Sequence, residues 1–396
     1  MTRQIVTGID IGTFETKVVI AESVSGAPGV IGTGTAQSFG VERGFITNIA
    51  EASQSLRTAV AKAEKLAGLK VRRAYVAFGG LGLGSLSAAG SVIISRADME
   101  ISERDLTLAM EEAERALPAS ATINKRVINS IPLEWRIDGK LSWGQPLGLK
   151  AEKLEVKALF ITCLEHHLED LIKTVEEAGI EVVDVVAAPV AASFVTVSKK
   201  ERRVGCLLAD IGAETFSIIS FENNNPASLE VLPVGGSDIT NDIALGLKTT
   251  LEDAENIKLG GLSRVTFSKK KLEEILGARL INSFEKVLAH LKKIGRDGLL
   301  PAGVILTGGA AVTFGTKLIA EEVLGLPTRV GEIHLGGKDS NKIRDTVWAV
   351  ACGAVSLGFN SDDKQSLIGR RNGKMAGIDG KHLFQKLSRW VSQFLP

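Results

Sequence analysis

The sequence predicts an α/β fold of two duplicated domains, because one series of motifs occurs twice along the chain. A strand, the tripeptide Asp-Ile-Gly, a short turn and a second strand occupy residues 5–22 and again residues 205–222. Each half then has an apolar strand ending in Gly-Gly and a helix of small residues; the strands are residues 74–80 and 303–309, and the helices are residues 187–193 and 348–356. Alternating strands and helices are typical of sheets covered by helices.

Length and composition are those of a globular protein of several subdomains. The 396 residues exceed what one small core organises, and roughly two to four subdomains are expected. Hydrophobic residues make up 44% and charged residues 23% of the chain. The net charge of +1 provides no field that would recruit nucleic acid, so we expect no nucleic-acid partner.

The cysteines and the chain start favour a cytosolic body. Cys163, Cys206 and Cys352 lie far apart in apolar runs without a CxxC spacing, which predicts buried free thiols. The histidines are scattered except for His166–His167, and adjacent positions do not share a helix face, so no metal-binding histidine cluster is expected. Residues 1–10 show no charged-then-apolar leader, and no apolar run reaches the ~18 residues of a membrane span.

The duplicated Asp-Ile-Gly turns indicate a site for Mg²⁺ and ATP. Glycine lets the backbone approach a phosphate and point its N–H groups at it. Asp10 and Asp210, each at the end of a strand, are hard oxygen ligands that suit Mg²⁺ held largely through water. Two such loops facing each other would clamp a triphosphate. The loop residues expected to bind ATP are Gly12, Thr13, Thr16, Lys17, Gly212, Ala213, Glu214, Thr215, Gly308 and Gly309.

Each motif alone also fits an ordinary structural role. Asp10 could cap a turn, and Gly308–Gly309 could form a tight turn into a helix. The ordered duplication favours the nucleotide site and resembles the actin/Hsp70/hexokinase ATPase fold. That resemblance implies two phosphate loops, an adenosine motif and two connecting helices.

Four stretches resemble the FtsA family of bacterial actin homologues, and the resemblance as a whole extends over nearly the entire chain. The stretch at 44–68 is similar to an early helical region of that family. Residues 127–140 (VINSIPLEWRIDGK) and 146–162 (PLGLKAEKLEVKALFIT) alternate as strands and resemble its distinctive subdomain 1C. Residues 235–258 resemble the start of its subdomain 2B. The helix at 101–117, with Ser102 as N-cap and Asp105 three residues on, belongs to the same inserted block.

The resemblance implies a division of the chain and completes the nucleotide site. Subdomain 1A takes residues 1–80 and 162–203, 1C residues 81–161, 2A residues 204–235 and 299–360, and 2B residues 236–298; residues 361–380 form a flexible linker and 381–396 an amphipathic membrane-targeting helix. In the family, a pair like Glu255 and Lys258 reaches the ribose and adenine, although its spacing also fits an exposed ion pair. Gly235, Gly236 and Ala310 complete the predicted ATP site.

The sequence predicts slow ATP hydrolysis at most. A hydrolysing actin-like protein orients water with Gln, Glu or Asp on the first connecting helix, and residues 187–193 hold none of these. The second loop reads DIGAET where DIGGGT is common, so Glu214 would repel phosphates unless Mg²⁺ or an outward turn relieves it. A positioned base typically contributes about 100- to 10,000-fold. We therefore expect ATP to act as a ligand that stabilises one conformation.

A long basic helix implies a protein partner. The family uses 2B to hold the C-terminal peptide of FtsZ, and the resemblance assigns that contact to Arg279 and Lys286. A solvated basic face is the other interpretation of these residues. Leu280, Ile281 and Asn282 depart from the family's acidic pattern after Arg279.

The last fifteen residues, HLFQKLSRWVSQFLP, predict an amphipathic helix that lies in a membrane interface. At 100° per residue its apolar side chains fall within an arc of roughly 140°, opposite Lys and Arg. A helix docked on the body or on a partner is the alternative, which the polar, Gly-bearing linker disfavours. The residues expected to bind anionic lipid are Leu383, Phe384, Lys386, Leu387, Arg389, Trp390, Val391, Phe394 and Leu395.

The sequence thus predicts an ATP-binding actin homologue that forms filaments on the cytoplasmic face of the membrane and anchors FtsZ there during cell division. Further division proteins are possible partners. Two alternatives remain at this stage. A PilM-like pilus-assembly adaptor would share the core but would not be expected to end in an amphipathic helix. A small-molecule kinase of the same fold would need a catalytic Asp in the first-domain cleft, for which the sequence offers no convincing candidate.

Overall fold

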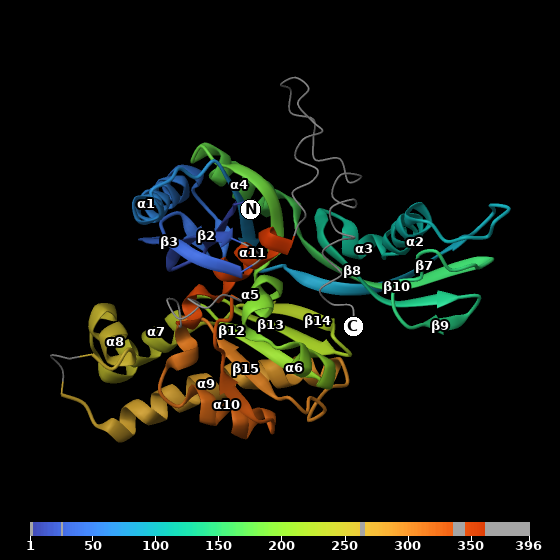
Figure 1. Ribbon diagram of the computed structural model, residues 1–396. Helices are drawn as coiled ribbons and strands as arrows, with labels where there is room; N and C mark the ends of the chain where they lie inside the picture. The colour runs from blue at the N-terminus through green and yellow to red at the C-terminus, as the bar shows by residue number, and fades with distance from the viewer. Residues whose placement is uncertain (1–2, 25–26, 262–265, 336–344, 361–396) are drawn as a thin grey trace.

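The computed structural model describes residues 3–24, 27–261, 266–335 and 345–360. Figure 1 shows two α/β domains, one above the other, and an inserted unit that projects to one side. Two helices, α5 (Ala188–Thr196) and α11 (Ala349–Asn360), lie between the two domains. The predicted C-terminal linker and amphipathic helix fall outside the described residues.

The N-terminal domain is built on a five-stranded sheet in the order β11-β6-β1-β2-β3. Its strands are β1 (Gln4–Ile11), β2 (Glu15–Val24), β3 (Ala27–Gln37), β6 (Arg73–Phe78) and β11 (Glu181–Ala187). The pairs β1–β2 and β2–β3 are antiparallel, whereas β1–β6 and β6–β11 are parallel. A short hairpin of β4 (Val41–Glu42) and β5 (Phe45–Ile46) stands apart from this sheet.

The C-terminal domain repeats this topology, which confirms the predicted duplication. Its strands run in the order β16-β15-β12-β13-β14, with the same antiparallel and parallel pairs. They are β12 (Cys206–Ile211), β13 (Phe216–Glu222), β14 (Asn225–Leu232), β15 (Val304–Thr307) and β16 (Thr328–Val330). In both domains the Asp-Ile-Gly turn joins the first two strands, and the Gly-Gly pair follows the neighbouring parallel strand.

The inserted unit extends the C-terminal sheet through a single register pair, Glu230 with Gly84. Its strands are β7 (Gly84–Ile93), β8 (Lys125–Ile137), β9 (Lys140–Ser142) and β10 (Lys153–Leu164), and its helices are α2 (Glu103–Arg115) and α3 (Ala119–Thr122). The predicted cap of α2 is confirmed, because Asp105 accepts a hydrogen bond from the Ser102 backbone N–H at 2.8 Å. The apolar face of α2 packs on β7 and β10.

Helices cover both sheets. On the N-terminal domain these are α1 (Ile49–Ala67) and α4 (Glu165–Glu177); on the C-terminal domain they are α6 (Lys199–Val204), α7 (Gly236–Leu247), α8 (Leu251–Lys258), α9 (Lys269–Lys293) and α10 (Thr316–Leu324). Short 3₁₀ turns occupy Gly309–Val312 and Thr346–Trp348. The subdomain boundaries stay predictions.

The two central helices cross the domain junction in opposite senses. Helix α5 leaves the N-terminal domain and contacts β12 and β13, whereas α11 leaves the C-terminal domain and contacts β1 and β2. The helices touch so closely that a Cβ on Gly353 would lie 1.9 Å from the Ala191 carbonyl oxygen. The small residues of both helices are therefore what this close crossing requires.

The cysteines behave as predicted, since all are buried and unpaired. Burial raises the pKa of Cys163, Cys206 and Cys352 to about 12, so these thiols are inert at neutral pH. Within the described residues, no helix is both long enough and apolar enough to span a membrane.

Candidate nucleotide site

The two Asp-Ile-Gly aspartates lie close together across the domain junction. Burial first, and the negative charge of Asp10 second, raise the pKa of Asp210, which is about 6. The Thr307 hydroxyl, which donates to Asp210 Oδ1 at 3.2 Å, and the ammonium of Lys17 act in the opposite direction. The site therefore concentrates negative charge that a cation would stabilise.

Lys17 is the cation that the chain itself supplies. It stands directly across from Asp10 in the β1–β2 pair, and its side chain is only 12% exposed. Burial raises the pKa of Asp10, and Lys17 lowers it. The Lys17 ammonium also approaches Glu15 at 3.8 Å. One lysine beside two carboxylates leaves room for a further positive charge.

The two predicted phosphate loops have matching backbones. The Gly12 N–H donates to the Glu15 carbonyl at 3.2 Å, and the Gly212 N–H donates to the Thr215 carbonyl at 2.9 Å. The Thr13 hydroxyl accepts from the Gly44 N–H at 3.1 Å, which leaves its own O–H able to donate to a ligand.

Thr16 lies on the buried face of β2. It is fully buried, and its hydroxyl shares a hydrogen bond of 2.9 Å with Ser38 Oγ. Successive side chains of a strand point to opposite faces, so Thr16 and Lys17 lie on opposite faces of β2. Lys17 is on the face of its cross-strand partner Asp10, and Thr16 is on the other, buried face.

The second loop rests on the start of α7. The Gly236 N–H donates to the Gly212 carbonyl at 2.9 Å, and the Ser237 N–H donates to the Ala213 carbonyl at 2.7 Å. A Cβ on Gly235 would lie 2.4 Å from the Ala213 carbonyl oxygen, so only glycine allows this contact. The loop is thereby fixed against a helix N-terminus, a favourable place for an anion.

Glu255 and Lys258 turn toward this loop. Lys258 Nζ donates to Glu255 Oε2 at 2.7 Å, to Thr240 Oγ1 at 2.9 Å and to the Gly236 carbonyl at 3.2 Å. The Lys258 side chain is 8% exposed, so this is not the solvent-exposed ion pair that the spacing alone allowed. Lys258 therefore lies beside Gly236, one of the residues predicted to form the ATP site.

The Gly-Gly motif of the second half closes this side of the site. Gly308 has φ +87°, and a Cβ there would lie 2.6 Å from Asp210 Oδ1, so the position needs glycine. Ala310 is buried, and its Cβ would be 3.3 Å from a Cβ added at Gly236. Gly309 is the first residue of the 3₁₀ turn Gly309–Val312, which also contains Ala310.

The donor set fits Mg²⁺ bound mostly through water. Within the described ranges no group of three or more His, Cys, Asp or Glu side chains forms a metal cage. Two nearby carboxylates, both with raised pKa, supply charge but few direct ligands. Mg²⁺ usually keeps several waters and takes one or two carboxylates beside phosphates. When bound, the ion would neutralise phosphate charge between Asp10 and Asp210.

Sequence reasoning missed several polar groups of this region. Thr307 precedes the Gly-Gly pair and stands opposite Asp210 in the parallel β12–β15 ladder, which was a readable signal. Thr240 bonds both Glu255 and Lys258 and lies one helical turn after Gly236, whose carbonyl it also bonds. The turn at Arg43–Gly44 contacts both loops through its backbone, and nothing in its side chains predicted that.

The predicted FtsZ-binding residues lie elsewhere, on α9. Arg279 forms a two-pronged ion pair with Asp242 of α7, with N···O distances of 2.6 and 2.8 Å. Lys286 is exposed two turns further along the helix. The two residues do not meet the nucleotide loops. The predicted lipid-binding residues, from Leu383 to Leu395, lie outside the described residues.

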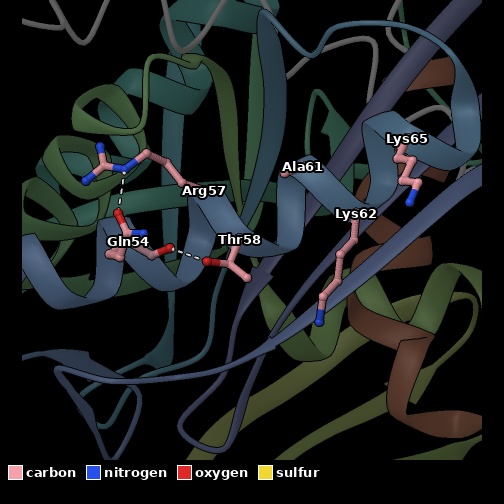
Figure 2. A pocket seen from close by; sticks show the side chains of 6 residues that line it. All are labelled: Gln54, Arg57, Thr58, Ala61, Lys62 and Lys65. Carbon is pink, nitrogen blue, oxygen red and sulfur yellow. Dashed lines mark hydrogen bonds between the residues drawn. The ribbon is translucent and has the colours of Figure 1, made fainter.

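An open depression on the outer face of α1 contains none of the predicted site residues. Figure 2 shows its lining, which is Gln54, Arg57, Thr58, Ala61, Lys62 and Lys65. Arg57 donates to the Glu177 carbonyl at 2.7 Å, and Lys62 donates to the Thr35 carbonyl at 2.8 Å. Arg57 and Lys62 thus hold α1 on its neighbours, and we assign no ligand to the depression.

Similarity to solved structures confirms the fold. The chain superposes on a protein titled "PilM-PilN type IV pilus biogenesis complex" with a TM-score of 0.66 at 19% identity, covering 89% of this chain and 98% of that one. The ethanolamine utilization protein EutJ from Carboxydothermus hydrogenoformans gives a TM-score of 0.52 at 18% identity, with 90% of each chain covered. The fold is that of the actin-like ATPases.

Sequence similarity identifies the family. The family model described as "Cell division protein FtsA" matches residues 207–353, and the one described as "SHS2 domain inserted in FTSA" matches residues 81–162. Cell division protein FtsA of Bacillus subtilis is 31% identical over 88% of this chain and 82% of its own length. Cell division protein FtsA of Pseudomonas aeruginosa is 27% identical over 98% of this chain and 97% of its own length. The chain belongs to the FtsA family of cell division proteins.

Proposed function

We propose that this protein binds Mg²⁺–ATP between its two phosphate loops. The observation that carries the proposal is the pair Asp10 and Asp210, held close by the two duplicated hairpins with Lys17 beside them. Gly12 and Gly212 would let the loop backbones approach the phosphates, and Mg²⁺ would sit between the carboxylates. Lys258, Glu255 and Gly308 would lie along the nucleoside.

ATP would serve as a structural ligand more than as fuel. Helix α5 carries no Gln, Glu or Asp, and its side chains are buried except for Phe194. The helix therefore offers no carboxylate or side-chain amide to orient an attacking water, and such a group is worth about 100- to 10,000-fold. Bound ATP would hold the two domains in one relative arrangement and so favour self-assembly into filaments.

The C-terminal segment would tether those filaments to the cytoplasmic face of the bacterial membrane at the division site. Each basic residue of 381–396 adds ~1 kcal/mol on an anionic leaflet, and burial of its apolar side chains adds several more. Ordering of the helix offsets part of this. One tail would bind weakly, whereas a filament that carries many tails would bind firmly.

The proposed partner is the C-terminal peptide of FtsZ, bound on α9. Arg279 and Lys286 offer positive charge on one side of this helix, and other division proteins would join at further surfaces. The tethered filament would then anchor FtsZ to the membrane.

Co-sedimentation with anionic liposomes tests the tether, using the full chain and a chain that ends at Gly380, each with and without Mg²⁺–ATP. We expect only the full chain to pellet, and more strongly with ATP. The full-length Trp390→Glu variant should stay in the supernatant, because it places a charge within the apolar arc. Equal pelleting of the full and shortened chains, or none by either, would reject the tether.

A further inference from the structure

The turn of the β4–β5 hairpin touches both phosphate loops through two consecutive backbone groups. The Arg43 N–H donates to Glu214 Oε2 of the second loop at 2.7 Å. The next N–H, that of Gly44, donates to the Thr13 hydroxyl of the first loop at 3.1 Å. One two-residue turn of the N-terminal domain therefore joins the phosphate loops of both domains.

Glu214 is well placed to hold this contact because its own loop is fixed. The preceding carbonyls of Gly212 and Ala213 accept from Gly236 and Ser237 at the start of α7. Gly235 allows the loop to pack this closely, since a Cβ there would lie 2.7 Å from the Glu214 N atom. The Glu214 carboxylate consequently turns away from α7 and crosses to the other domain. This geometry is the outward turn that a carboxylate in a phosphate loop requires.

The hairpin turn is anchored on its far side as well. The Arg43 carbonyl accepts from the Leu81 N–H at 3.3 Å, at the point where the inserted unit begins. The Phe45 ring stacks on His167 of α4 with ring centroids 3.6 Å apart. Gly80 allows this packing, because a Cβ there would lie 2.8 Å from the Phe45 ring. The Arg43 peptide units therefore link the second phosphate loop to the root of the insert.

We propose that Glu214 is a cross-domain latch, which holds the β4–β5 turn against the second phosphate loop and thereby closes the cleft and fixes the root of the inserted domain. A bond between two anchored segments transmits a shift of either one to the other. A ligand that draws the two loops together would strengthen the latch, and by linkage the latch would raise the ligand's affinity, chiefly by slowing its release. The predicted effect on ligand release rests on the proposed nucleotide site, whereas the latch itself does not.

Hydrogen exchange tests the latch without any ligand, because the donor is a single backbone amide. In the full-length protein, Glu214→Ala should speed exchange at the Arg43 amide by roughly three- to tenfold, the range expected for one partly exposed charged hydrogen bond. Exchange at Leu81 should rise in the same direction. Glu214→Gln keeps an acceptor oxygen and should show a smaller effect. Unchanged exchange at Arg43 in Glu214→Ala would overturn the latch, and a change at Arg43 but not at Leu81 would overturn its link to the insert.

Glu42→Gln is the matched control. Glu42 lies on the same hairpin, is exposed, and precedes Arg43 directly, so the variant removes one negative charge but leaves the bond from the Arg43 N–H to Glu214 intact. It should leave exchange at Arg43 unchanged. If Glu42→Gln speeds exchange as much as Glu214→Ala, charge near the turn governs exchange and the latch is wrong.

The rate at which a fluorescent ATP analogue leaves the protein in Mg²⁺ tests the predicted effect of the latch on the ligand. We expect Glu214→Ala to release it roughly three- to tenfold faster than wild type, with Glu42→Gln at the wild-type rate. Equal or slower release from Glu214→Ala would overturn the role in retention. If wild type binds no analogue at all, the proposed nucleotide function fails, and hydrogen exchange alone decides the latch.

Discussion

The charge of Asp10 raises the pKa of Asp210, although 200 positions separate these two residues in the chain. The duplicated sheets place both carboxylates at the strand ends that face the domain junction. Like charges so close together are costly unless a proton or a metal ion neutralises them. This relationship makes the site dependent on pH and on cations, and it is the physical basis of the predictions that concern the site.

Stability of the ligand-free protein should fall as pH rises from about 4 to about 6. The pKa of Asp210 is about 6 in the folded protein, whereas an unfolded Asp titrates near 3.9. Within that window the folded state binds more protons than the unfolded state, so the free energy of unfolding decreases with pH. Denaturant titrations at several pH values measure this trend. The control is Asp210→Asn, in which the free energy of unfolding should change much less with pH. If it changes equally with pH in both proteins, another group causes the dependence.

Mg²⁺–ATP should raise the melting temperature more at pH 7.5 than at pH 5.5. Below about pH 6 a proton on Asp210 competes with the metal ion for the same carboxylate, so metal binding releases that proton. Thermal melts with and without Mg²⁺–ATP at both pH values provide the comparison. A larger stabilisation at pH 5.5 would contradict the assignment of Asp210 to the metal.

Gly353→Ala should destabilise the protein by about 3 kcal/mol or more. The added methyl would lie 1.9 Å from the Ala191 carbonyl, which forces α5 and α11 apart at the domain junction. Gly277→Ala in α9 is the matched control, because nothing lies within 4 Å of its added Cβ. That variant should gain ~0.5–1 kcal/mol from helix propensity. Urea titration measures the change in the free energy of unfolding for both variants. A Gly353→Ala variant as stable as wild type would show that the crossing of α5 and α11 can relax.

The ion pair between Arg279 and Asp242 predicts opposite effects on binding of an FtsZ C-terminal peptide. Arg279→Glu should weaken binding by roughly tenfold or more, because it reverses the charge that an acidic peptide would meet. Asp242→Asn should strengthen binding, since it releases Arg279 from a carboxylate that now competes with the peptide. Fluorescence polarisation with a labelled peptide measures both. If Asp242→Asn weakens binding as Arg279→Glu does, the ion pair supports the fold of α7 and α9 and is not part of the binding face.

Local sequence patterns were sufficient to predict helices, strands and turns, but not the contacts that their residues make with one another. The hairpins around Asp10 and Asp210, the Gly-Gly strands and the cap of α2 follow from residue spacing within short windows. Thr16 and Lys17 were grouped together, although strand alternation puts their side chains on opposite faces of β2 and Thr16 is buried against Ser38.

Contacts between segments far apart in the chain could not be predicted from the sequence. Glu214 was treated as a charge near phosphates, whereas its oxygen bonds a backbone N–H that lies 171 positions earlier. Any residue type except proline could supply that N–H, so no side-chain pattern at Arg43 marks it. Likewise, the basic face of α9 gave no sign that Arg279 already pairs with Asp242 of another helix.

Binding of a fluorescent ATP analogue to wild type and to Asp210→Asn, each in Mg²⁺ and in EDTA, tests the central claim most directly. Asp98→Asn, the same change on the inserted unit, serves as the control. We predict that wild type and Asp98→Asn bind in Mg²⁺ and lose at least about tenfold in affinity in EDTA, and that Asp210→Asn binds weakly in both. Affinity in Asp210→Asn equal to that of wild type, or binding by wild type that ignores Mg²⁺, would contradict a metal–nucleotide site between the two duplicated loops.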